Sequence, residues 1–228
     1  NSIEEGQSYN FINAFGEIMF EESYIDSGKL SVSYFLDDFK SNEIQVKFQP
    51  KFKFPLDIFG QDFNNLFLDF SIEYLQGEFA RSYENTAAIQ HQFFVAGLKP
   101  TYNFEVRNFD IKLGGKIYFS SDIENNTSQF FAYPDVQVSY PIIKNFATIY
   151  IGATGDLHNN TYKNFTDKNP YVSPTLHITQ TNEMYNFFAG FNGKLSAEIS
   201  YNTKISYTKE EDKALLSINN SKSDGNTA

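Results

Sequence analysis

The amino-acid sequence predicts an all-β fold, specifically an antiparallel transmembrane β-barrel in which about ten strands are visible as part of a larger barrel. Apolar residues alternate with polar ones along most of the chain, and the alternating segments are long. The content of 25 Phe and 15 Tyr is high for a chain whose mean hydropathy is −0.42. Alternation, strand length and aromatic content together favour strands with one face against lipid.

The stretch from Glu43 to Phe54, EIQVKFQPKFKF, shows the alternation most clearly. Apolar side chains occupy every second position from Ile44 onward, and charged or amide side chains lie between them. Strand side chains point alternately to two faces, so a strand sorts these residues into one apolar and one charged face. A helix would scatter the same residues around its circumference.

Similar alternation predicts the remaining strands in chain order. We expect strands at residues 12–24, 29–37, 43–54, 66–77, 92–106, 109–120, 129–140, 146–157, 184–194 and 197–208. Their apolar phases include Leu30, Val32 and Tyr34, then Leu68, Phe70 and Ile72, then Ile111, Leu113 and Ile117, then Ile149 and Ile151, then Phe187 and Phe191, and last Ile205 and Tyr207. An ordinary soluble strand averages about 5–6 residues. Many of these segments instead reach the roughly 9–11 residues that cross a membrane.

The polar phase carries full charges in mid-strand, which we interpret as the lining of a polar interior. The candidate interior-facing residues are Lys47, Lys51, Asp69, Glu73, Lys112, Lys116 and Lys204. A large secreted sandwich or jelly roll also places charges on its outer faces, so charge alone leaves that alternative open. Strand length, aromatic content and charge together favour the membrane barrel.

The expected connections alternate in length, as the short periplasmic and longer extracellular loops of outer-membrane barrels do. The short ones are 107–108, 141–145 and 195–196, and the long ones are 77–91, 121–128 and 158–183. We therefore predict that 158–183 is one long extracellular loop, although its segment 172–178 resembles a strand. Residues 55–65 break the rule, because they make a long inner turn.

The two ends of the chain and four prolines add further expectations. The chain ends on a polar stretch, SINNSKSDGNTA, and it begins without an initiator methionine or a signal peptide. We expect a mature or excised segment that does not close a barrel alone and is completed by further chain. Proline falls in the apolar phase at Pro50, Pro100, Pro134 and Pro174, which we interpret as bulges or as points outside the hydrocarbon band.

Residues 169–207, NPYVSPTLHITQTNEMYNFFAGFNGKLSAEISYNTKISY, resemble a stretch of the outer-membrane barrels described as TonB-dependent-receptor-like. FDIKLGGKIYF at 109–119 and DVQVSYPIIKN at 135–145 are similar to hairpins of the same group. The resemblance extends over residues 90–215 and implies an outer-membrane barrel of a Gram-negative bacterium. It concerns the barrel portion only, because no stretch resembles the plug domain or the TonB box. No catalytic residue is carried over from it.

Composition excludes several classes of protein. The absence of cysteine excludes disulfides and thiolate chemistry. No run of about 18 apolar residues is present, which excludes a helical membrane protein. The formal net charge is −10, and the only arginines are Arg81 and Arg107. We therefore expect no nucleic-acid partner, because nucleic-acid binding needs a basic stripe.

The sequence contains no recognisable catalytic or metal motif. His91, His158 and His177 lie far apart in the sequence. We interpret each as a residue of a loop or of the girdles that lie at the two membrane interfaces of a barrel. The neighbouring carboxylates Asp37 and Asp38 are interpreted as a solvated strand end. Two loops rich in Asp and Asn offer oxygen ligands for calcium, but a solvated loop explains them more simply. A hydrolase built from distant Ser and His residues stays open. We expect no enzyme, no cofactor and no bound metal.

Three functions are consistent with these features. The first is a porin-like or receptor-like outer-membrane barrel for passage or binding of a small solute, with the lipid bilayer as its main partner. The second is an accessory barrel subunit of an outer-membrane assembly, secretion or uptake complex. The third is a secreted soluble β-sandwich that binds carbohydrate. Strand length separates the third from the others, whereas the first two share the same sequence features.

Overall fold

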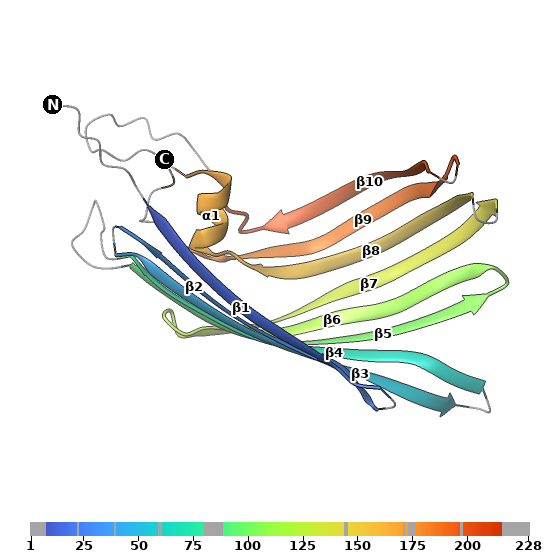
Figure 1. Ribbon diagram of the computed structural model, residues 1–228, viewed down its shortest axis with the longest axis horizontal. Coiled ribbons are helices and arrows are strands. Elements are labelled where there is room, and N and C mark those ends of the chain that lie inside the picture. The colour runs from blue at the N-terminus through green and yellow to red at the C-terminus, as the bar shows by residue number, and fades with distance from the viewer. Residues whose placement is uncertain are drawn as a thin grey trace.

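The computed structural model is one antiparallel sheet of ten strands in the order of the chain, from β1 to β10 (Figure 1). The structure describes residues 8–21, 23–38, 40–58, 61–79, 89–143, 146–170, 172, 177–196 and 198–215. The strands are β1 Tyr9–Met19, β2 Ile25–Asp37, β3 Asn42–Ile58, β4 Gln61–Phe79, β5 Ile89–Val106, β6 Phe109–Asp122, β7 Thr127–Ile143, β8 Ala147–Asn159, β9 Gln180–Lys194 and β10 Ser200–Glu211. The helix is α1 Tyr162–Lys168. The predicted all-β, antiparallel fold is confirmed.

The predicted inner turn at 55–65 is wrong, because both strands continue through it. β3 runs to Ile58 and β4 begins at Gln61, with Asp57 opposite Asp62. The register of the β3–β4 pairing shifts between Phe54 and Leu56, at the intervening proline, which has no N–H to donate to the ladder. The short connection 59–60 fits the alternation of connection lengths from β3 onward, whereas the connection 20–24 is longer than 38–41.

Strand pairing gathers the apolar phases into one face, called the apolar face below. Directly opposed residues of neighbouring strands lie on the same side of a sheet. One row of such residues crosses β2 to β7 through Leu30, Phe48, Ile72, Ala96, Phe119 and Phe130. A second row crosses β5 to β10 through Phe104, Ile111, Val138, Ile151, Ala189 and Ile205.

The opposite side, called the polar face below, is concave. β8 ends at Asn159, and the backbone N–H of Tyr162 donates to Glu43 on β3. On a flat sheet five strand spacings would separate β3 from β8 by about 24 Å, whereas three residues reach only about 10 Å. The sheet therefore curves toward its polar face, as Figure 1 shows, with α1 at the mouth of the curve.

The sheet is not closed into a barrel. β1 pairs with β2 and β10 pairs with β9, and no ladder joins β1 to β10. The expectation that these strands do not close a barrel alone is confirmed. Completion by further chain stays a prediction. Among the described residues, no helix has the length and apolar character needed to cross a membrane.

Pro50, Pro100 and Pro134 interrupt pairing without forming bulges. Ladder pairs on both sides of Pro50 keep one register between β3 and β4, and the same holds around Pro100 between β5 and β6. Pro134 lies next to the point where the β7–β8 ladder ends, at Asp135 opposite Thr154. The interpretation as bulges is therefore wrong for these three, and Pro174 lies outside the described residues.

The long connection is shorter than predicted and contains a helix that the sequence did not predict. Because β8 extends to Asn159 and β9 begins at Gln180, the connection is 160–179 rather than 158–183. Its seven-residue helix α1 begins after Thr161, whose side chain accepts a hydrogen bond from the Asn164 N–H. The described residues of the strand-like segment 172–178 lie outside the strands, as expected.

Candidate functional site

The candidate site is the polar face, where the predicted charged residues lie together. Lys47 lies opposite Glu73, and Lys47 Nζ is 3.4 Å from Glu73 Oε2. Lys51 lies opposite Asp69 in the β3–β4 pairing, but its Nζ contacts a different acid and lies 3.7 Å from Asp26 Oδ2 on β2. The Oδ1 atom of Asp69 is buried without a hydrogen-bond partner among the described residues.

The remaining predicted lysines also contact groups on the polar face. Lys112 Nζ lies 2.8 Å from Asp135 Oδ1, and Lys116 Nζ lies 2.6 Å from Asp156 Oδ2. Lys204 Nζ lies 4.4 Å from the centre of the Phe188 ring, a cation–π contact. All seven predicted residues are thus on one face, and each of the five lysines contacts an acidic side chain or an aromatic ring of another strand.

Asp135 is the main acidic centre that sequence reasoning missed. It is 7% exposed and lies between two cations, with Lys99 Nζ 3.2 Å from Oδ2 and Lys112 Nζ 2.8 Å from Oδ1. The polar phase of β7, which runs through Asp135 and Gln137, was the signal that could have found it. The positive and negative charges of these side chains cancel locally. The polar face therefore carries charges of both signs rather than an electrostatic potential of one sign.

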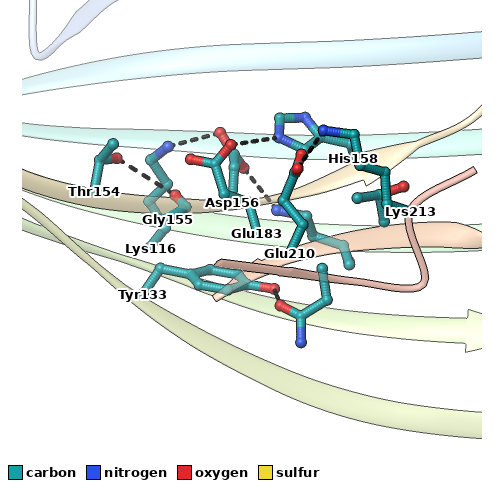
Figure 2. A network of polar contacts seen from close by, with 12 residues as sticks. Lys116, Tyr133, Thr154, Gly155, Asp156, His158, Glu183, Glu210 and Lys213 are labelled. Atoms are coloured by element: carbon teal, nitrogen blue, oxygen red, sulfur yellow. Dashed lines mark hydrogen bonds and ion pairs between the residues drawn. The ribbon is translucent and has the colours of Figure 1, made fainter. Parts of the chain in front are cut away.

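The backbone ladder between β7 and β8 stops at Asp135 and Thr154, and side-chain contacts take its place toward the α1 end. Figure 2 shows this network. Lys116 and the Tyr118 hydroxyl both contact the Asp156 carboxylate, the latter at 2.8 Å. The Tyr133 hydroxyl donates to Asn182 Oδ1 on β9 at 2.7 Å. Side chains therefore hold β6 and β7 to β8 and β9 where the ladder ends.

Gly155 makes this network possible. A Cβ atom there would lie 2.7 Å from a Tyr133 ring carbon and 2.8 Å from the Glu183 carbonyl oxygen. The β8–β9 register shifts between Thr154 and Asp156, which places the Asp156 carboxylate toward Lys116. His158 Nε2 lies 3.6 Å from Glu183 Oε2 on the neighbouring strand (Figure 2). His158 is thus a strand residue and not a loop residue.

A second cluster holds the 160–179 connection against β2 to β5. Glu43 Oε2 accepts the Tyr162 N–H at 2.8 Å, and its Oε1 accepts the Lys163 N–H at 3.4 Å. His91 Nε2 lies 3.3 Å from Glu43 Oε2, and both side chains are 4% exposed. His91 lies near the start of β5, so its assignment to a loop is wrong. His177 is exposed in the connection.

Aromatic packing surrounds this cluster. The Tyr162 ring packs edge-on against Phe79 at 4.9 Å and against Phe35 at 5.3 Å between ring centres. The Tyr162 hydroxyl donates to Asp37 Oδ2 at 3.3 Å, and Asp37 is 5% exposed. Asp37 is therefore not a solvated strand end. Phe165, Val172 and Ile178 of the same connection complete the buried core.

Clefts open on this surface at both ends of the described strands. One of about 290 Å³ lies where the β7–β8 ladder stops, and we call it the β7–β8 cleft. It is lined by Phe93, Ser120, Asp122, Thr127, Gln129, Phe131, Leu157, Thr179, Gln180, Asn182, Glu211 and Asp212. The other, of about 480 Å³, lies at the opposite end of β5 to β7 and includes Glu105, Lys112 and Gln137. Within the described ranges, no three His, Asp or Glu side chains gather as metal ligands.

Comparison with family models, curated proteins and solved structures finds no match to this chain. The resemblance to TonB-dependent-receptor-like barrels stays a prediction.

Proposed function

We propose that this chain forms wall strands of an outer-membrane β-barrel in a Gram-negative bacterium, porin-like or receptor-like in function. The apolar face contacts lipid, and the polar face lines an interior where a small polar solute passes or binds. The observation that carries the proposal is the exposure of the apolar face. Phe48, Ile72, Leu113 and Ile151 are 44%, 46%, 47% and 56% exposed although they lie in mid-strand.

Water is a poor solvent for such a face. Soluble monomers rarely expose contiguous apolar patches larger than a few hundred Å². Here the two apolar rows extend across β2 to β10, and neither has a covering layer among the described residues. Contact with lipid would remove these apolar side chains from water. The strand lengths also fit, because the shortest, β1, has 11 residues and a membrane strand needs roughly 9–11.

The alternatives differ in what the sheet must contact. A sandwich buries its apolar faces between two packed sheets, whereas the described strands form one sheet. An accessory barrel subunit has a specific observation in its favour, namely that β1 and β10 each have one edge that no other described strand pairs. A partner wall would pair such edges, because an unsatisfied backbone group costs several kcal/mol in lipid.

Quenching by brominated lipid tests which face meets the bilayer. The chain has no tryptophan, so Leu113→Trp and Lys112→Trp each introduce one reporter at adjacent positions of β6. In bilayers with brominated acyl chains we expect strong quenching of the Leu113→Trp variant and weak quenching of the Lys112→Trp variant. Equal quenching of the two reporters, or quenching of neither, would refute the proposal.

A further inference from the structure

We propose that the β7–β8 cleft binds a sugar-sized polyhydroxylated solute that carries no negative charge. The inference rests on the proposed function, since it names the class of solute for the same polar face. The cleft has a volume of about 290 Å³, near the lower end of the roughly 300–1,000 Å³ of typical small-molecule sites.

The walls of the cleft are joined by side-chain hydrogen bonds. Ser120 Oγ on β6 donates to Gln180 Oε1 on β9 at 2.6 Å, across two intervening strands. Asn182 accepts from the Tyr133 hydroxyl and donates to Glu211 Oε2 on β10 at 3.2 Å. The two sides are thus fixed before a ligand enters, which lowers the entropic cost of binding.

The lining matches hydroxyl groups. The Gln129 amide offers both donors and acceptors, and the Gln180 and Asn182 amides, which each already donate once and accept once, keep a second N–H and a second lone pair; hydroxyl groups likewise both donate and accept. Gln129 is exposed and has no side-chain hydrogen bond to the described residues. The half-buried Phe131 ring adds an apolar surface beside these amides, suited to the C–H face of a sugar ring.

The charges of the lining select against anions. Asp122, Glu211 and Asp212 border the cleft, and no Lys, Arg or His belongs to the lining among the described residues. An anionic ligand would meet these like charges, and the cation paired with them is Lys209, which lies outside the lining with its Nζ 4.0 Å from Glu211 Oε1. A neutral sugar is accepted through hydrogen bonds, and an amino sugar gains an additional attraction to the carboxylates.

The second cleft provides a matched control. Gln129 and Gln137 are both on β7 and both face the polar side, but Gln137 lines the cleft at the opposite end of the strands. Gln129→Ala therefore removes one amide from the proposed site, and Gln137→Ala removes the same group from a surface outside it. Neither side chain is buried, so both variants keep the fold.

Saturation-transfer NMR on the full chain folded in detergent tests the site, with glucose, glucosamine and glucuronate as probes. These three share one ring and differ in charge. We expect transfer to glucose and glucosamine and little to glucuronate. Gln129→Ala should weaken glucosamine binding by about fivefold, the effect of one lost hydrogen bond. Gln137→Ala should leave it unchanged.

Three results would overturn the inference: no transfer to any probe, equal transfer to glucuronate, or equal weakening by Gln129→Ala and Gln137→Ala. The lipid-quenching experiment tests the barrel-wall proposal independently of this sugar-binding experiment. Strong quenching at Leu113→Trp together with no sugar signal would remove the solute assignment and leave the barrel-wall proposal standing.

Discussion

The backbone N–H of Tyr162 donates to Glu43 Oε2 at 2.8 Å, and the two residues are 119 positions apart in the sequence. This contact fixes the start of α1 to β3 and holds the 160–179 connection over the polar face. The carboxylate also contacts His91, so a single acidic side chain serves two buried partners. Charge-assisted hydrogen bonds of this kind are roughly twice as strong as neutral ones.

Removing the Glu43 carboxylate should release the connection. Glu43→Ala leaves the buried Tyr162 N–H without its acceptor, and an unsatisfied buried group costs about 1–3 kcal/mol. We expect trypsin to cut after Lys163 and Lys168 about 5- to 100-fold faster in the folded variant, since cleavage follows local opening. Glu105→Ala, an exposed acid at the other end of the polar face, is the control. Unchanged cleavage of Glu43→Ala would show that the carboxylate does not hold the connection.

Gly77 is required by the position of His91. A Cβ atom at Gly77 would lie 2.2 Å from His91 Cε1, so an alanine must push the imidazole away from Glu43. Gly77→Ala should therefore destabilise the protein by about 1–3 kcal/mol, as overpacking typically does. Gly28→Ala is the control, because no atom lies within 4 Å of its added Cβ. The measurement is the urea midpoint of folding in lipid, and equal midpoints for both variants would contradict the packing argument.

Adjacent positions of β6 should respond oppositely to charge. Leu113 is 47% exposed on the apolar face, whereas Lys112 pairs with Asp135 on the polar face. A lysine on the lipid face near mid-membrane costs about 2–4 kcal/mol. Leu113→Lys should therefore lower folding stability in bilayers by that amount. Lys112→Leu should cost much less, because Asp135 keeps Lys99. Equal losses for the two variants would refute the assignment of faces.

How far the sequence predicts this structure depends on how far apart in the sequence the interacting residues are. Alternation is local, so it correctly predicts ten strands and opposite faces for Lys112 and Leu113, although β1 ends at Met19 rather than at residue 24. The extension of β3 to Ile58 was missed because Pro55 and Gly60 suggest a turn, whereas pairing across the hairpin decides the outcome. The helix α1 was missed because seven residues are too few for a helical period.

The contacts of the candidate site lie beyond pattern reasoning. Lys116 meets Asp156 across β7, and His91 meets Glu43 across β4, so both pairs depend on sheet curvature and strand register. Single-sequence alternation specifies the face of a residue but not its partner two strands away. The alternation therefore assigns a charged residue such as Asp135 to one face of the sheet, but it does not predict which side chains of other strands surround it.

The 160–179 connection should lie outside the cell. It leaves the same end of the sheet as the connections 38–41, 80–88 and 123–126, and it is longer than the connections at the opposite end, which include 20–24, 107–108 and 195–199. Outer-membrane barrels place their longer loops outside. Trypsin added to intact cells should therefore cut after Lys168, which is exposed, and spare Arg107. Cleavage after Arg107 in intact cells would invert the topology, and permeabilised cells control for access to that turn.

The edges of β1 and β10 should each be paired by further strands of chain rather than by each other. In lipid, an unpaired edge leaves backbone N–H and C=O groups unsatisfied at several kcal/mol each, so both edges need a partner. The chain has no cysteine, so introduced pairs report cleanly on proximity. Ile12→Cys with Tyr34→Cys, which are directly opposed on β1 and β2, should react with a short bifunctional thiol reagent. Ile12→Cys combined with cysteine at Thr203, Ile205 or Tyr207 of β10 should not. Efficient crosslinking of any β1–β10 pair would mean that these ten strands close on themselves in the bilayer, and the larger-barrel proposal would then be abandoned.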